Sequence, residues 1–138
     1  MNEHIVNKVI VITGAASGFG RLVSIKAAAL GAQMVCADID RAELEVTENT
    51  IKAAGGSVTS LVTDVTHLEQ MQALANHAID HFGRIDVWIN NAGIMPLAFH
   101  ADHAIAAPAW NRCIDINFKG VMHGIMAAHD HMINQGQG

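Results

Sequence analysis

A glycine-rich segment near the N-terminus has the spacing that lets a polypeptide backbone approach a phosphate. It reads Thr-Gly-Ala-Ala-Ser-Gly-Phe-Gly from Thr13 to Gly20, after the β-branched apolar run Lys8–Thr13 and before a segment rich in helix formers. A strand, a glycine turn and a helix in this order direct backbone amides and the positive end of the helix dipole at an anion. Without that context a plain tight turn would be as good an interpretation. With it, the segment predicts a pyrophosphate site.

A carboxylate closes the next apolar run. Asp38 lies eighteen residues after Gly20, at the end of Gln33–Asp38. An acidic side chain at this place can accept hydrogen bonds from both ribose hydroxyls of an adenosine and repel a 2'-phosphate. The glycine turn contains no Lys or Arg, and Arg41, the one cation nearby, is expected at a solvated helix start. These residues favour NAD over NADP.

The elements that must position these groups alternate along the chain. Short apolar runs predict strands at Lys8–Thr13, Gln33–Asp38, Val58–Val62 and Ile85–Asn90. Helix formers and apolar side chains at helical spacing predict helices at Ser17–Leu30, from Asp40 to near Gly55, from Thr66 to Gly83, and from Pro108 onward. Thr66 and Glu69 have capping-box spacing at the start of the third helix. Pro108 is predicted at the first position of the last helix, after a loop over Asn91–Ala107.

Alternating strands and helices predict an α/β fold, a Rossmann-type doubly wound parallel sheet in a three-layer α/β/α arrangement. Right-handed crossovers give the strand order 3-2-1-4, with a ligand crevice at the carboxyl ends of strands 1 and 4. No linker or repeat interrupts the pattern, so residues 1–138 are predicted to form one dinucleotide-binding domain. The last residues, Gln135–Gly138, stand where the alternation calls for a fifth strand. We therefore expect an incomplete domain, truncated after the fourth strand and its helix, with that strand as a bare edge.

Two motifs together resemble the short-chain dehydrogenase/reductase family: the glycine segment and Asn90-Asn91-Ala92-Gly93 after the fourth strand. The resemblance covers essentially the whole chain. Asp64-Val65 is similar to the pair with which this family contacts adenine, and Trp110–Gly120 is similar to its helix carrying a catalytic asparagine, here Asn117.

The resemblance also implies which residues bind the cofactor. The pyrophosphate and the nicotinamide ribose would contact Gly14, Ser17, Gly18, Phe19 and Gly20. The adenosine ribose would contact Asp38 and Ile39, and the middle of the cofactor would contact Asn91, Ala92 and Gly93.

Hydride chemistry in this family also uses a serine, a tyrosine and a lysine four residues after the tyrosine. The tyrosine is the general acid and base, the lysine lowers its pKa, and the serine binds the substrate oxygen. The 138 residues contain no tyrosine. The resemblance implies an NAD(P)-dependent oxidoreductase that interconverts alcohols and carbonyls of small molecules, with this chain as the cofactor-binding half, inactive by itself. The alternative is a non-catalytic NAD-binding module or scaffold.

The composition of the chain limits the kinds of partner that the protein is expected to bind. A net charge of -5 and eight scattered Lys and Arg residues argue against nucleic acid. No apolar run approaches the roughly 18 residues of a membrane span, and the N-terminus lacks a signal-peptide pattern, so we expect a soluble, cytoplasmic protein.

The nine histidines include His77 and His81, one helical turn apart, but no set of ligands converges in sequence, and no metal site is predicted.

The last predicted helix has a broader apolar face than one side of a sheet requires, with Ile114, Phe118, Val121, Met122, Ile125, Met126, Met132 and Ile133. In the family that the chain resembles, this helix packs against its two-fold copy. A homo-oligomer, a dimer or tetramer, is therefore expected for the intact protein.

Overall fold

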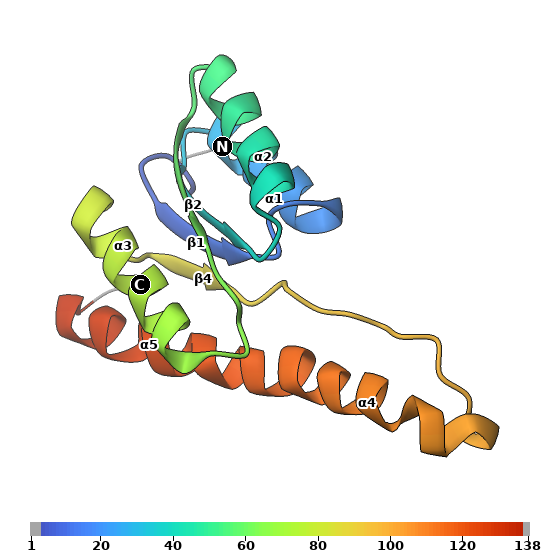
Figure 1. Ribbon diagram of the computed structural model, residues 1–138. Coiled ribbons are helices and arrows are strands. Elements are labelled where there is room, and N and C mark those ends of the chain that lie inside the picture. Colours follow the sequence, from blue (N-terminus) through green and yellow to red (C-terminus); the bar gives the residue numbers. More distant parts are fainter. Residues whose placement is uncertain (1–3, 137–138) are drawn as a thin grey trace.

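The computed structural model describes residues 4–136 and shows a parallel four-stranded sheet between two layers of helices (Figure 1). The strands are β1 (Val9–Thr13), β2 (Gln33–Asp38), β3 (Ser57–Val62) and β4 (Val87–Ile89). The helices are α1 (Gly18–Ala29), α2 (Arg41–Ala53), α3 (Leu68–Phe82), α4 (His103–Ile114) and α5 (Gly120–Gln135). A 3-10 turn, η1 (His100–Asp102), precedes α4, and a π-helical turn, η2 (Asp115–Lys119), joins α4 to α5.

The order of the strands is β3-β2-β1-β4, and every neighbouring pair is parallel. This confirms the predicted α/β class and strand order. The winding reverses at β1, because the chain moves outward through β2 and β3 and then returns to place β4 on the other side of β1. The carboxyl ends of β1 and β4 therefore lie at the switch point of the sheet, where this fold places its ligand crevice.

Strand β1 is buried along its whole length because helices cover both of its faces. Val9 and Val11 point to one side, into a core that α3 completes with Met71 and Leu74. On the other side, β1 faces a second core shared with α1 and α2. That core includes Ile10, Ile12, Met34, Cys36, Leu44 and Ile51. Side chains that alternate between two apolar cores explain why this strand reads as a continuous apolar run.

Strand β4 has one free edge within the described residues, since it pairs only with β1 there. Beside this edge lies an apolar groove of about 250 Å³ between β4 and α5. Its lining includes Trp88, Gly124, Ala128 and Met132. The unpaired edge expected for the fourth strand is thus present within residues 4–136.

The last helix begins earlier than predicted. The expected loop ends at Phe99, α4 starts at His103, and Pro108 lies inside that helix and not at its first position. The reason is the alanine-rich run around residues 104–107, which has high helix propensity and continues the helix past the proline. The proline costs one backbone hydrogen bond, which the remaining turns outweigh.

The predicted capping box at Thr66 and Glu69 is wrong. The N-cap of α3 is His67, and no side chain caps it. The Thr66 hydroxyl and amide instead donate to Asp64 Oδ1 at 2.7 and 2.9 Å. An aspartate two residues upstream competes for the threonine by forming a local turn, and here it prevails.

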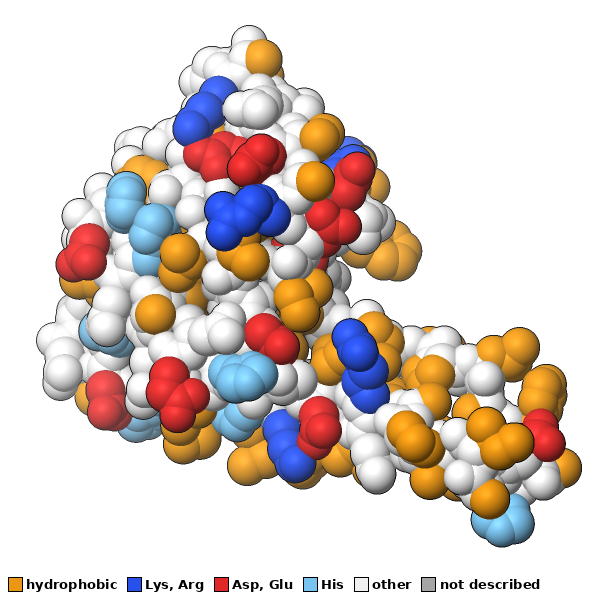
Figure 2. Space-filling model, in the orientation of Figure 1, with side chains coloured by type: hydrophobic (Ala, Val, Ile, Leu, Met, Phe, Trp, Pro, Cys, Tyr) orange, Lys and Arg blue, Asp and Glu red, His pale blue; other side chains and the backbone are white. Residues whose placement is uncertain are grey.

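Large apolar side chains are exposed along the C-terminal helices, as the sequence predicts. Met122, Ile125, Met126 and Ile133 are all between 46% and 65% exposed. Hydrophobic side chains also gather on the arm formed by α4 and the segment before it, which projects from the body (Figure 2). Even so, none of the helices in residues 4–136 combines the length and the apolar character needed to cross a membrane.

A buried carboxylate joins the beginnings of β1 and β4. Asp86 is 4% exposed and accepts a hydrogen bond from the Val9 amide at 2.9 Å, and it pairs with Arg84 and with Lys8. Burial alone would raise the pKa of the Asp86 carboxyl. The Val9 amide, the Arg84 guanidinium and the Lys8 ammonium outweigh burial and lower this pKa below its ordinary value.

We predict that Asp86→Asn lowers the free energy of unfolding by roughly 1–2 kcal/mol at pH 7. Because the folded-state pKa is lowered, the charge stabilises the fold fully above the unfolded pKa of about 3.9 and loses its effect as pH falls through the folded value. Urea denaturation at several pH values measures this, with Asp80→Asn, an exposed carboxylate on α3, as control. A deficit that is equally large at pH 7 and pH 3 would contradict the assignment.

Candidate functional site

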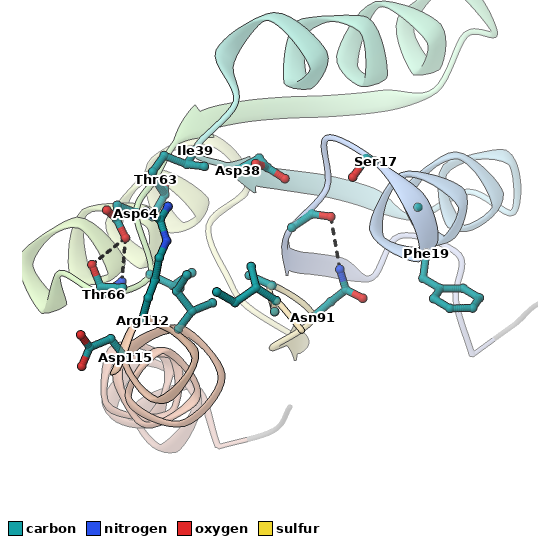
Figure 3. A pocket seen from close by; sticks show the side chains of 17 residues that line it. Ser17, Phe19, Asp38, Ile39, Thr63, Asp64, Thr66, Asn91, Arg112 and Asp115 are labelled. Atoms are coloured by element: carbon teal, nitrogen blue, oxygen red, sulfur yellow. Dashed lines mark hydrogen bonds between the residues drawn. The ribbon is translucent and has the colours of Figure 1, made fainter. Parts of the chain in front are cut away.

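A cleft of about 600 Å³ lies at the carboxyl ends of the strands, at the point where the winding reverses. Figure 3 shows its lining side chains, which come from the glycine turn, from the ends of β2, β3 and β4, and from α4 and η2. The lining residues are Gly14, Ser17, Gly18, Phe19, Asp38, Ile39, Thr63, Asp64, Val65, Thr66, Asn91, Ala92, Gly93, Ile94, Arg112, Asp115 and Ile116.

The glycine turn leaves no room for side chains at two positions. A Cβ at Gly14, which has a φ of +71°, would stand 2.9 Å from Ala92 Cα. A Cβ at Gly20 would stand 1.9 Å from the carbonyl oxygen of Gly14. Gly14 thus permits the turn to touch the segment after β4, and Gly20 permits α1 to start directly beneath the turn. Gly18 differs, since it has a φ of +52° and no atom lies within 4 Å of its would-be Cβ.

Thr13 and Asn91 bind the turn to the end of β4. The buried Thr13 hydroxyl accepts hydrogen bonds from the amides of Asn91 and Ala92, at 3.2 and 3.1 Å. In return the Asn91 side-chain amide donates to the carbonyls of Thr13 and Gly14, at 3.0 and 3.2 Å. These four bonds fix the two loops that flank the cleft relative to each other. Sequence reasoning did not find the part that Thr13 takes in this.

Helix α2 supports the turn from beneath. The Thr47 hydroxyl, fully buried, lies 2.9 Å from the carbonyl oxygen of Ala15 and donates to it. The same hydroxyl oxygen accepts from Arg21 Nε at 2.9 Å, and Arg21 also pairs with Glu43 at 2.6 Å. The turn is therefore held by side chains from α1 and α2 as well as by its own backbone.

Asp38 is hydrogen-bonded to two backbone amides. Its Oδ2 accepts from the Ala16 amide of the glycine turn at 2.9 Å, and its Oδ1 accepts from the Asp40 amide at 3.0 Å. These bonds set the direction of the carboxylate, which borders the cleft next to Ile39. A carboxylate oxygen has more than one lone-pair site, so Asp38 retains acceptor capacity towards a ligand hydroxyl.

Asp64 is the acidic residue at the end of β3. Burial would raise the pKa of its carboxyl, but hydrogen bonds from Thr66 and the charges of His67 and Arg112 outweigh burial and lower it below its ordinary value. The adjoining Val65 is held from the other side by α5. The His123 ring bonds through Nδ1 to the Val65 carbonyl at 2.8 Å, and a Cβ at Gly120 would come within 2.8 Å of the Val65 side chain.

Asn117 lies in the π-helical turn η2 and bonds with both backbone groups of Ile94. Its Oδ1 accepts from the Ile94 amide at 2.8 Å, and its Nδ2 donates to the Ile94 carbonyl at 2.7 Å. Its oxygen would also be 3.3 Å from a Cβ at Gly93. The asparagine thereby attaches the long helical segment to the loop after β4, just behind the cleft.

The structure gathers eleven of the thirteen predicted site residues around one cleft. Gly20 and Asn117 are outside its lining, Gly20 beneath the turn and Asn117 behind Ile94. Six lining residues were not predicted: Thr63, Thr66, Ile94, Arg112, Asp115 and Ile116. Helical spacing could have found two of them, because Arg112 and Asp115 are three residues apart and share a face of the helix that carries Asn117. Asp115 forms an ion pair with Lys119 of the same turn at 2.6 Å.

The two cysteines are free thiols. Cys36 lies in β2, where burial, together with the charge of Glu48 and against a hydrogen bond with Ser24, raises the pKa of the thiol to about 11. Cys113 is partly buried, and its sulfur lies 3.6 Å from the Ile94 carbonyl oxygen. Both thiols are therefore packed within the fold.

The fold and the cleft define a Rossmann-like doubly wound α/β protein with its crevice at the switch point of the sheet. A family model described as short chain dehydrogenase matches residues 8–138. The chain therefore belongs to the short-chain dehydrogenase family, as the resemblance in the sequence indicates.

Individual relatives agree with this assignment. An uncharacterized oxidoreductase of Listeria innocua is 42% identical over 132 residues, which are 96% of this chain and 52% of the relative. A short-chain dehydrogenase/reductase from Burkholderia phymatum, solved in complex with NAD, is 39% identical with a TM-score of 0.91 over 96% of this chain and 47% of its own. NAD+-bound xylitol dehydrogenase is 30% identical with a TM-score of 0.91, over 97% and 51%. The chain thus spans about half the length of these relatives.

The steric limit at Gly20 gives a prediction. Gly20→Ala should lower the free energy of unfolding by roughly 1–3 kcal/mol and move the Asn91 side-chain amide signal in NMR spectra, because the new methyl group displaces the turn. Gly83→Ala is the control: it has a φ of +77°, open space and no contact with the turn. Gly83→Ala should lower the free energy of unfolding by about 1 kcal/mol and leave the Asn91 signal in place. A stable Gly20→Ala variant with an unshifted Asn91 signal would disprove the close packing.

Proposed function

We propose that this chain is the NAD-binding portion of an oxidoreductase that interconverts an alcohol and a carbonyl on a small molecule. The observation that carries the proposal is the arrangement of the glycine turn, Asp38, Asp64 and the segment Asn91–Gly93 around a single cleft. In the proposal, residues 1–138 act as one dinucleotide-binding unit. A cytoplasmic location is also proposed.

The groups around the cleft fit an extended dinucleotide. Gly18 lines the cleft with an approachable backbone, and Ser17, the N-cap of α1, makes no side-chain cap bond, so the first amides of this helix are available to a pyrophosphate. Asp38 would accept hydrogen bonds from the adenosine ribose hydroxyls beside Ile39. Asp64 and Val65 would contact the adenine, and Asn91, Ala92 and Gly93 would contact the middle of the cofactor. When bound, NAD supplies the hydride acceptor of the reaction.

The charge of the cleft favours NAD over NADP. Three of its lining residues, Asp38, Asp64 and Asp115, are acidic, whereas Arg112 is the one cation among them. Arg41 is exposed at the start of α2 and is not part of the lining. The 2'-phosphate of NADP carries as many as two negative charges and would lie beside the Asp38 carboxylate, which two backbone amides hold in place. The resulting repulsion disfavours NADP.

We predict that the protein binds NAD at least tenfold more tightly than NADP, and that Asp38→Asn narrows this ratio by about tenfold. Asparagine keeps one side-chain acceptor for the backbone amides while it removes the charge. Asp40→Asn is the matched control, because Asp40 caps α2 through the Glu43 amide and asparagine caps equally well. Calorimetric titration of both cofactors measures the ratio. Equal affinity in the unmutated protein, or an equal effect of both variants, would refute the role of Asp38.

The 138 residues are proposed to be inactive in hydride transfer by themselves. No tyrosine is available to donate or accept the proton at the substrate oxygen. An asparagine such as Asn117 does not replace it, because an amide does not exchange protons near neutral pH and both polar atoms of this side chain already bond with Ile94. The loss of general acid and base catalysis forfeits a factor of roughly 10²–10⁴.

We therefore predict that residues 1–138, purified alone, bind NAD but do not change NADH absorbance with a panel of alcohols and ketones. Turnover that survives purification and disappears in Asn117→Ala would contradict this, since protons would then move without a tyrosine. The coding sequence after codon 138 separates the enzyme from a non-catalytic NAD-binding module. An in-frame strand that ends in serine, followed by Tyr-x-x-x-Lys, supports the enzyme, and a stop codon supports the module.

Self-association is part of the proposal for the intact protein. It rests on the apolar residues that α5 exposes, Met122, Ile125, Met126 and Ile133. A helix face of this composition is stable in water when it packs against another apolar surface.

A further inference from the structure

Arg112 is a charged side chain in the cleft to which neither the family resemblance nor the proposed cofactor contacts assign a role. It belongs to α4, at the opposite wall from β2, and it is the one Lys or Arg among the lining residues. The side chain is solvent-exposed and enters none of the hydrogen bonds or ion pairs identified within residues 4–136. A long cation that faces a cleft in this way is available to a ligand.

The direction of the side chain places it at one end of the cleft. Figure 3 shows Arg112 extending from α4 towards Thr63 and Ile39 and past Asp64. Its charge contributes to lowering the pKa of the Asp64 carboxyl, as expected for neighbouring groups of opposite charge. This is the end at which the proposed cofactor would place its adenosine, because Asp38 and Ile39 border it.

The two walls at this end differ in chemistry and are complementary to a flat aromatic ring. Ile39 is 60% exposed, so its aliphatic surface faces the cleft without a protein partner to cover it. Arg112 brings a planar, delocalised cation from the other side. A purine ring is flat and electron-rich, and guanidinium planes stack on such rings more favourably than ammonium groups do.

We propose that Arg112 is a cofactor-binding residue that stacks its guanidinium on the adenine ring, opposite Ile39. This inference rests on the proposed function, since it presupposes that the cleft takes an adenine dinucleotide. Asp64 keeps the guanidinium in position through its charge. Arg112 thereby adds affinity for the adenosine half of the ligand, whereas the 2' position of the ribose stays under the control of Asp38.

Calorimetric titration of the whole protein with NAD, NADP, ADP-ribose and nicotinamide mononucleotide tests this proposal. Arg112→Ala should lower the affinity for NAD and for ADP-ribose by about tenfold each, and the affinity for NADP by the same factor. Nicotinamide mononucleotide, which lacks adenine, should bind as before. Arg112→Lys keeps the charge but loses the plane, and its affinity for ADP-ribose should stay within about threefold of that of the alanine variant. Lys26→Ala, an exposed cation on α1 outside the cleft, is the control and should change none of these affinities.

Three results would overturn the role of Arg112. If Arg112→Lys bound ADP-ribose as tightly as the unmutated protein does, charge alone would account for the effect. A loss confined to NADP would make Arg112 a 2'-phosphate ligand, and unchanged ADP-ribose binding in Arg112→Ala would exclude any contact. Failure of the proposed function looks different, because the unmutated protein would then bind neither NAD nor ADP-ribose. Thermal unfolding of each variant verifies that the fold is retained, which is expected for an exposed side chain.

Discussion

The close approach of the glycine turn to the end of β4 is the contact on which the rest of the site depends. At Gly14 and Gly20 a single added methyl group would collide with backbone or with the Asn91 side chain. The same two segments are joined by the Thr13 hydroxyl and the Asn91 amide. These loops leave the carboxyl ends of adjacent parallel strands and both line the cleft, so their contact fixes this part of its lining.

Asp38 connects this framework to the proposed ligand. Its carboxylate accepts hydrogen bonds from the glycine turn and from the start of α2, so the group proposed to select the ribose also stabilises the loop proposed to hold the pyrophosphate. Thr47 and Arg21 reinforce the turn from the helices behind it. A rigid site of this kind loses little conformational entropy when a ligand binds, which is the physical advantage of building it on strand ends.

The sequence predicts the framework well because local pattern and global fold agree in it. Buried strands such as Val9–Thr13 are continuous apolar runs, and Gly14 and Gly20 have no alternative residue type that would fit. Contacts between distant segments were harder to predict. The paired hydroxyl of Thr13, the turn that Asp64 imposes on Thr66, and the entry of Arg112 into the cleft all depend on neighbours that the linear sequence does not bring together. Pro108 shows the opposite failure, in which a strong local rule was outweighed by the helix propensity around it.

A structure of the protein with NAD tests the central claim most directly. The account predicts the pyrophosphate against the amides of the glycine turn, the adenosine ribose on Asp38, and the middle of the cofactor beside Asn91–Gly93. NAD bound elsewhere, or bound in the cleft in the reverse direction with its nicotinamide at Asp38 and Asp64, would contradict it.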